Sequence, residues 1–146
     1  MTDATDWAGP HSALYDELLL DGFDLVVNTE DQKYFGNRLI QLRRSATQLR
    51  VVRDRSQWSL EIAGPGGIEW FSPAVWRALV EGDLGRLDVL TPAEEDAFIR
   101  DNLWRIERCI ADNEGVTLVL LREWRARRAA ARRARPSEWP PGARSL

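Results

Sequence analysis

The stretch Arg50–Ile62, RVVRDRSQWSLEI, carries the clearest structural pattern of the chain. Two apolar runs flank a charged Asp-Arg-Ser turn, and the second run alternates apolar and polar residues from Gln57 to Ile62. Strict alternation is the period of a strand that buries one of its two faces. The stretch therefore predicts an antiparallel hairpin with a charged, exposed turn.

The segments around this hairpin predict an α+β fold. Residues 23–28 and 36–45 have the same strand period, and short turn-rich gaps separate the runs, as in an antiparallel meander. Leucines at helical spacing follow Pro10. Residues 72–82, 91–115 and 116–135 are each typical of a helix. We expect an N-terminal helix, a four-stranded antiparallel meander sheet, and then three helices, the last of them long and rich in Arg and Ala.

The chain reads as one domain. Its 146 residues, 44% hydrophobic and 29% charged, suit a single globular unit. We expect this domain to span residues 1–135, with 1–9 a flexible lead-in and 136–146 a proline-rich tail. The single cysteine, Cys109, excludes an intrachain disulfide. No apolar run approaches the roughly 20 residues that cross a membrane, and the acidic N-terminus is unlike a signal peptide, so the expected location is cytoplasmic.

No catalytic motif stands out. His11 is the only histidine, and without a cysteine pair it predicts no zinc site. Glu94, Glu95 and Asp96 form a dense acidic group, but a helix N-terminus stabilises such acids by about 0.3–1 kcal/mol each. We therefore expect no enzyme, cofactor or metal. A small hydrolase or transferase stays a third interpretation, which requires a polar pocket around His11 or paired carboxylates with raised pKa values.

Charge is distributed unevenly along the chain. Residues 1–30 contain acids and no Lys or Arg, whereas residues 122–135 hold seven arginines and one acid. Four arginines spaced by three, four and three positions would lie on one face of a helix: Arg125, Arg128, Arg132 and Arg135. Such a face can follow a phosphate backbone, which suggests a nucleic-acid-associated or regulatory accessory protein. The net charge of −3 favours instead neutralisation between the two ends of the chain, so this function is our alternative.

Residues 34–82 carry a family resemblance. They combine FGN at 35–37, the Arg-Asp-Arg turn at 53–55, QW at 57–58, an alternating strand and VWR at 75–77. This pattern resembles small actinobacterial proteins of the immunity-factor type, which accompany bacterial toxin systems. Those proteins have glycine where this chain has Ser56.

The resemblance implies a non-enzymatic protein that binds one cognate toxin and inhibits it by covering its surface. Many such toxins are basic nucleases, toward which an acidic region would steer association. The residues expected to contact the partner are Asp16, Asp21, Asp24, Glu30 and Asp31, followed by Arg53, Asp54, Arg55 and Trp70. No membrane partner is expected, and the sequence leaves the oligomeric state open.

Overall fold

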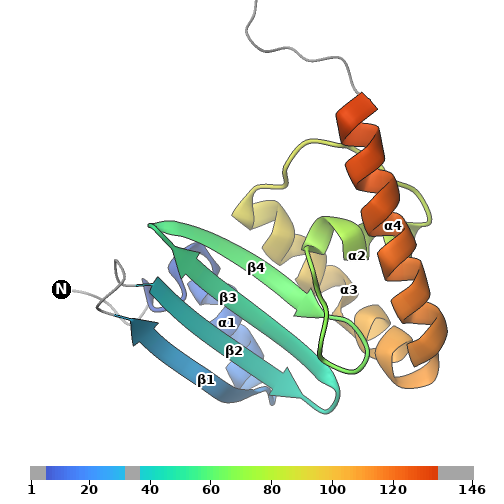
Figure 1. Cartoon of the computed structure of the whole chain (residues 1–146). Helices are drawn as coiled ribbons and strands as arrows, with labels where there is room; N and C mark the ends of the chain where they lie inside the picture. Colours follow the sequence, from blue (N-terminus) through green and yellow to red (C-terminus); the bar gives the residue numbers. More distant parts are fainter. Residues whose placement is uncertain (1–5, 32–36, 135–146) are drawn as a thin grey trace, which may run out of the picture.

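The structure, a computed structural model, describes residues 6–31 and 37–134 and has the predicted α+β fold (Figure 1). A 3-10 turn, η2 (Gly9–His11), leads into α1 (Ser12–Leu20). The strands are β1 (Asp24–Asp31), β2 (Asn37–Arg44), β3 (Thr47–Asp54), β4 (Gln57–Ala63) and β5 (Trp70–Phe71). The remaining helices are α2 (Pro73–Glu81), α3 (Pro92–Asp112) and α4 (Glu114–Ala134).

The strands form one antiparallel sheet in the order β1-β2-β3-β4-β5. The predicted four-stranded meander is confirmed, and the fifth strand was not predicted. β5 adds only the pairs Ile62↔Phe71 and Ala63↔Trp70. Two residues are too few to show an alternating pattern, which is why sequence periodicity could not find this strand.

The β3–β4 hairpin closes through a two-residue turn at Arg55 and Ser56. Both residues adopt positive φ angles, 51° and 69°. Two left-handed residues in succession give the turn the twist that flanking strands require. The side-chain oxygen of Asn37 accepts a hydrogen bond from the Arg55 N–H at 3.1 Å, so the end of β2 holds the turn in place.

One face of the sheet packs against α1 and α3, which lie behind it in Figure 1, while α2 packs near its β4 end. The side chains on this inner face are at most 2% exposed: Ile40, Leu42, Leu49, Val51, Leu60 and Ile62. The buried ring of Trp76 on α2 donates to the Ile62 carbonyl at 3.2 Å. The Tyr15 hydroxyl on α1 likewise donates to the Ile40 carbonyl at 3.1 Å. These bonds fix the helices on the sheet without leaving buried polar atoms unsatisfied.

Residues 6–9 belong to the expected lead-in, yet the structure packs them against the core. Ala8 is fully buried, and the Trp7 ring lies edge-on to Tyr15 with 5.7 Å between ring centroids. Gly9 has φ 60° and lies against the Trp58 ring. The expectation of flexibility therefore fails for these residues. Residues 1–5 and the expected tail 136–146 lie outside the described part of the chain.

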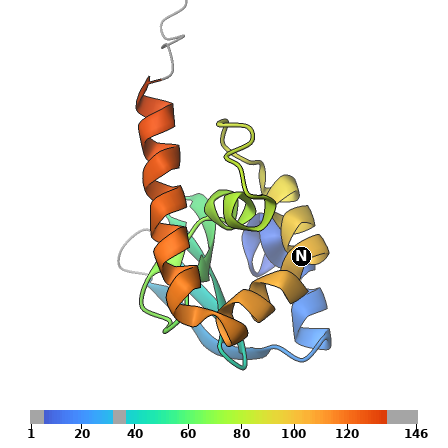
Figure 2. The same ribbon diagram turned by 90° about the vertical axis from the view of Figure 1, so that its right-hand side faces the viewer.

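The second half of α4 is anchored to the rest of the protein through Arg128. The helix extends past the sheet, as Figure 2 shows. Arg128 is nevertheless only 8% exposed, because its guanidinium donates to the carbonyls of Arg86, Leu87 and Asp88 at 3.1–3.2 Å. Within residues 6–31 and 37–134, no helix is long and apolar enough to cross a membrane.

Candidate functional site

The sheet face opposite α1 and α3 is covered by no helix of the described chain (Figure 1). We call it the outer face. The strand register places on it the residues that alternate with the core: Thr29, Leu39, Gln41, Arg43, Gln48, Arg50, Val52, Ser59 and Glu61. A sheet with one solvated face normally presents polar residues there. Here Leu39 and Val52 lie among them and are only partly buried.

Toward β5, polar side chains on the outer face pair with one another. Gln41 donates to Gln48 at 2.5 Å across β2 and β3. Arg50 forms an ion pair with Glu61 at 2.7 Å, and its guanidinium lies 4.3 Å from the centroid of the Trp70 ring. Cross-strand and cation–π pairs of this kind hold the side chains in fixed positions. This half of the outer face is therefore a preorganised polar surface.

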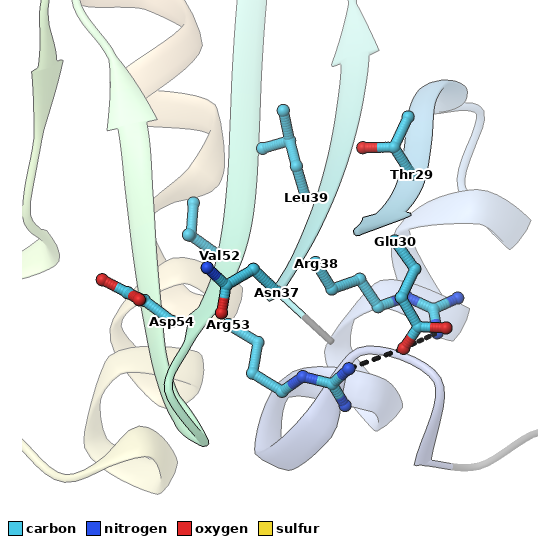
Figure 3. Close-up of a pocket in the computed structure, with 8 residues that line it drawn as sticks. All are labelled: Thr29, Glu30, Asn37, Arg38, Leu39, Val52, Arg53 and Asp54. Atoms are coloured by element: carbon cyan, nitrogen blue, oxygen red, sulfur yellow. Dashed lines mark hydrogen bonds and ion pairs between the residues drawn. The ribbon is translucent and has the colours of Figure 1, made fainter. Parts of the chain in front are cut away.

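Toward the opposite end, the sheet carries a hollow of about 540 Å³. Figure 3 shows the residues that line it: Thr29, Glu30, Asn37, Arg38, Leu39, Val52, Arg53 and Asp54. The Glu30 carboxylate lies between two guanidinium groups, 2.6 Å from Arg53 and 4.0 Å from Arg38. By the strand register, Thr29, Leu39 and Val52 belong to the outer face. Glu30, Arg38 and Arg53 alternate with them, so these ion pairs border the hollow from the helix side of the sheet.

The hollow brings together three of the residues expected to contact a partner, Glu30, Arg53 and Asp54. Arg55 lies next to them in the β3–β4 turn. Trp70 lies at the far end of the outer face, beneath Arg50. The structure thus gathers the turn residues at one end of the sheet and separates them from Trp70.

The expected acidic contacts do not form one patch. Asp16 accepts a hydrogen bond from the Trp7 ring at 2.9 Å, on the helix side of the sheet. Asp21 forms an ion pair with Arg44 at 3.0 Å. Asp24 is exposed at the start of β1, and the backbone of Asp31 pairs with Asn37 at the other end of that strand.

Two of the four arginines on the predicted face of α4 are engaged within the protein. Arg125 forms an ion pair with Glu69 at 3.0 Å and stacks 4.7 Å from the Phe71 ring. Arg122 binds the same carboxylate, and these hydrogen bonds hold the pKa of Glu69 below its ordinary value. Arg128 is buried against carbonyl groups, and Arg132 is exposed. Arg135 lies outside the described residues.

Sequence reasoning missed a buried polar cluster of His11, Glu95 and Asp96. The Nδ1 atom of His11 lies 2.5 Å from Oδ1 of Asp96, and its Nε2 atom lies 3.6 Å from Oε1 of Glu95. The His11 and Asp96 side chains are 1% and 7% exposed. Glu95 and Asp96 lie near the start of α3, which Thr91 and Glu94 cap with a reciprocal pair of hydrogen bonds. His11 and Asp96 are 85 positions apart in the sequence, so no local pattern could indicate that their side chains meet.

The cluster perturbs the titration of its neighbours. Burial raises the pKa of Glu95 to about 7; the charge of His11 opposes this shift and that of Asp96 adds to it. Burial, and then Asp96, raises the pKa of Tyr15 well above its ordinary value. The Nε2 atom of His11 is buried and lacks a hydrogen-bond partner. A raised carboxyl pKa beside a histidine is typical of acid–base sites, but a substrate could reach Nε2 only if the protein opened. In this conformation the cluster joins η2 to α3.

Within the described residues, no group of three or more His, Cys, Asp or Glu side chains is arranged to hold a metal ion. A scan against protein-family models, a search of curated proteins and a search of solved structures each return no match. The function must therefore be inferred from the surface and the buried groups themselves.

Proposed function

We propose that this chain is a non-enzymatic protein-binding inhibitor of the immunity type, which covers the surface of a toxin with the outer face of its sheet. The observation that carries the proposal is the uncovered outer face, with its hollow of about 540 Å³ at the β1–β3 end. An inhibitor of this type needs a rigid complementary surface and no reactive group.

The hollow has physical features that favour protein binding. Leu39 and Val52 supply apolar area, whose removal from water is worth about 25 cal/mol per Å². Arg50 and Glu61 on the same face are already paired, so a partner meets side chains that have lost much of their rotational freedom. The antiparallel ladder on both sides of β2 keeps this surface rigid. Preorganisation of this kind lowers the entropy cost of association.

The buried His11 cluster supports the same interpretation rather than hydrolase or transferase activity. A general base must lie within hydrogen-bonding reach of the proton that it removes. His11 is fully buried, and its Nδ1 atom is occupied by Asp96. A stabilising role accounts for this geometry.

The test begins with capture of a partner. Tagged full-length protein is pulled from its native cells in moderate salt, with and without nuclease treatment. We expect one stoichiometric protein partner that survives the nuclease and whose toxicity is suppressed when the two are expressed together. Capture that the nuclease abolishes would contradict the proposal and favour the alternative function through the arginines of α4.

A variant of the outer face then tests the site. Val52→Arg places a bulky charge beside the hollow, and we expect binding of the captured protein to weaken at least about tenfold, or about 1.4 kcal/mol. Val119→Arg is the matched control, because Val119 is 53% exposed on α4, a different element. Equal affinities of the two variants would show that the outer face is not the binding surface. Thermal unfolding of both variants establishes that each is folded.

A further inference from the structure

Among the described residues, no strand pairs with one edge of β1, the outermost strand of the sheet. It is the first strand in the sheet order and pairs only with β2. In Figure 1 no described element lies along its other side. From Asp24 to Glu30, every residue of β1 except Val27 is exposed. An edge strand of this length presents a row of backbone N–H and C=O groups to which another strand can pair.

Apolar side chains accompany this edge. Leu25 is 45% exposed and Val26 37% exposed, and Leu20, at the end of α1 shortly before the strand, is 91% exposed. A register shift between Leu25 and Val27 marks a bulge, after which Val27–Asp31 pairs regularly with β2. Bulges are one device by which proteins discourage edge pairing. Here the bulge lies near the start of β1, so the regular part of the edge stays available.

The charges of β1 argue against pairing with a second copy of the chain. The strand contains Asp24, Glu30 and Asp31 and no basic residue. Two antiparallel β1 strands paired about their centres would set Asp24 of one copy opposite Asp31 of the other, twice. Like charges directly opposite each other destabilise a strand pair. A complementary strand would instead carry basic residues at its two ends and β-branched residues between them.

We propose that the partner protein adds such a strand, with Arg or Lys at its ends, to the free edge of β1. This inference rests on the proposed function and specifies how the partner engages the sheet. Main-chain hydrogen bonds along residues 27–31 would supply affinity, and Asp24 and Asp31 at the two ends of β1 would supply selectivity. The added strand would extend the outer face beside the hollow, so both surfaces would be covered together.

The decisive measurement is residue-resolved amide hydrogen exchange of the full-length protein. The probe is a seven-residue peptide of alternating Val and Thr between terminal arginines, and the matched control replaces both arginines with glutamates. Strand addition forms hydrogen bonds with every second residue of an edge. We therefore expect the Arg-ended peptide, at millimolar concentration, to slow exchange at least about tenfold at alternate amides of β1. The Glu-ended peptide should leave them unchanged.

Three results would overturn the inference: no protection of β1, equal protection by both peptides, or protection that appears without peptide as protein concentration rises. The last would identify a second copy as the occupant. The same exchange measurement on the complex with the captured partner separates the two proposals. If Val52→Arg weakens that complex while β1 amides stay unprotected in it, the proposed function stands and strand addition fails. If Val52→Arg binds the partner normally, the outer face is not the binding surface, whatever protection the β1 amides show.

Discussion

Nδ1 of His11 lies 2.5 Å from Oδ1 of Asp96, and this buried hydrogen bond ties η2 to the start of α3. Both side chains are more than nine-tenths buried. The bond therefore closes the domain between its N-terminal segment and a helix that lies far along the chain.

We predict that His11→Ala destabilises the protein by about 3–5 kcal/mol, because it leaves the Asp96 carboxylate buried without its partner. Urea unfolding followed by circular dichroism measures the change. Glu17→Ala is the control: it removes the pair between Glu17 and Arg100, whose side chains are 55% and 41% exposed. Its effect should stay below about 1 kcal/mol. Similar losses of stability for the two variants would show that the buried pair contributes no more to stability than the exposed pair.

The second prediction concerns pH. In the folded protein the pKa of Glu95 is raised from its ordinary 4.5 to about 7. Between these values the folded state binds a proton that the unfolded state has released, so the free energy of unfolding falls as pH rises from about 4.5 to about 7. Above pH 7 this group contributes no further change.

Glu95→Gln removes this carboxyl while keeping its shape. Urea unfolding at pH 5, 6, 7 and 8 measures the free energy of unfolding of both proteins. This free energy should decline less with rising pH in the variant than in the wild type. The difference between the two proteins is the informative quantity, because it isolates the contribution of Glu95, which the charges of His11 and Asp96 face. Parallel stability curves across this range would contradict the assignment.

The fold was more predictable from sequence than the polar cluster, for a physical reason. The alternation of β4 and the capping box of Thr91 and Glu94 are local patterns, so they could be recognised within a few residues. The contact between His11 and Asp96 depends on how α3 packs, which no local pattern encodes. The helix-dipole explanation of Asp96 was sufficient for the sequence but incomplete, because the same carboxylate also binds a histidine.

The outer face illustrates the same limit. Strand periodicity indicated which side chains share a face, but the elements that cover that face depend on the paths of the helices. Arg53 and Asp54 were expected at an exposed turn, and they line the hollow at that end of the sheet. The pairing of Arg53 with Glu30 required the registers of β1, β2 and β3, which the sequence does not specify.

The third prediction concerns the hairpin turn. Ser56 has φ 69°, a conformation that glycine adopts without steric cost. We expect Ser56→Gly to raise the free energy of unfolding by about 0.5–1 kcal/mol, since relief of left-handed strain, about 1–2 kcal/mol, exceeds the added entropy of the unfolded chain. Ser59→Gly is the control within extended β4, where glycine should destabilise. A loss of stability in both variants would contradict the argument from the turn.

The fourth prediction concerns the attachment of α4. Arg128 donates to the carbonyls of three consecutive residues, 86–88, and is nearly buried. Arg128→Lys keeps the charge but cannot reproduce this planar set of donors. We expect a loss of about 1–3 kcal/mol and faster proteolysis of the loop around residue 87. Arg132 is exposed on the same helix, so Arg132→Lys should change neither the free energy of unfolding nor the rate of proteolysis. Equal effects of the two substitutions would show that the bonds from Arg128 to the carbonyls do not hold α4 in place.

The last prediction concerns how the N-terminal segment packs against Trp58 on the inner face of the sheet. A Cβ atom at Gly9 would lie 2.4 Å from the Trp58 ring, and Gly9 also has a positive φ of 60°. Gly66→Ala shares the backbone strain, at φ 90°, but its Cβ would meet nothing within 4 Å. We therefore expect Gly9→Ala to destabilise the protein by about 1–3 kcal/mol more than Gly66→Ala, the usual cost of overpacking. The Arg53 guanidinium lies 5.4 Å from the centroid of the Trp58 ring, so displacement of that ring should also disturb the pair that Arg53 makes with Glu30. Urea unfolding of both variants measures the difference. Equal stability of Gly9→Ala and Gly66→Ala would show that close packing of Gly9 against Trp58 does not limit the fold.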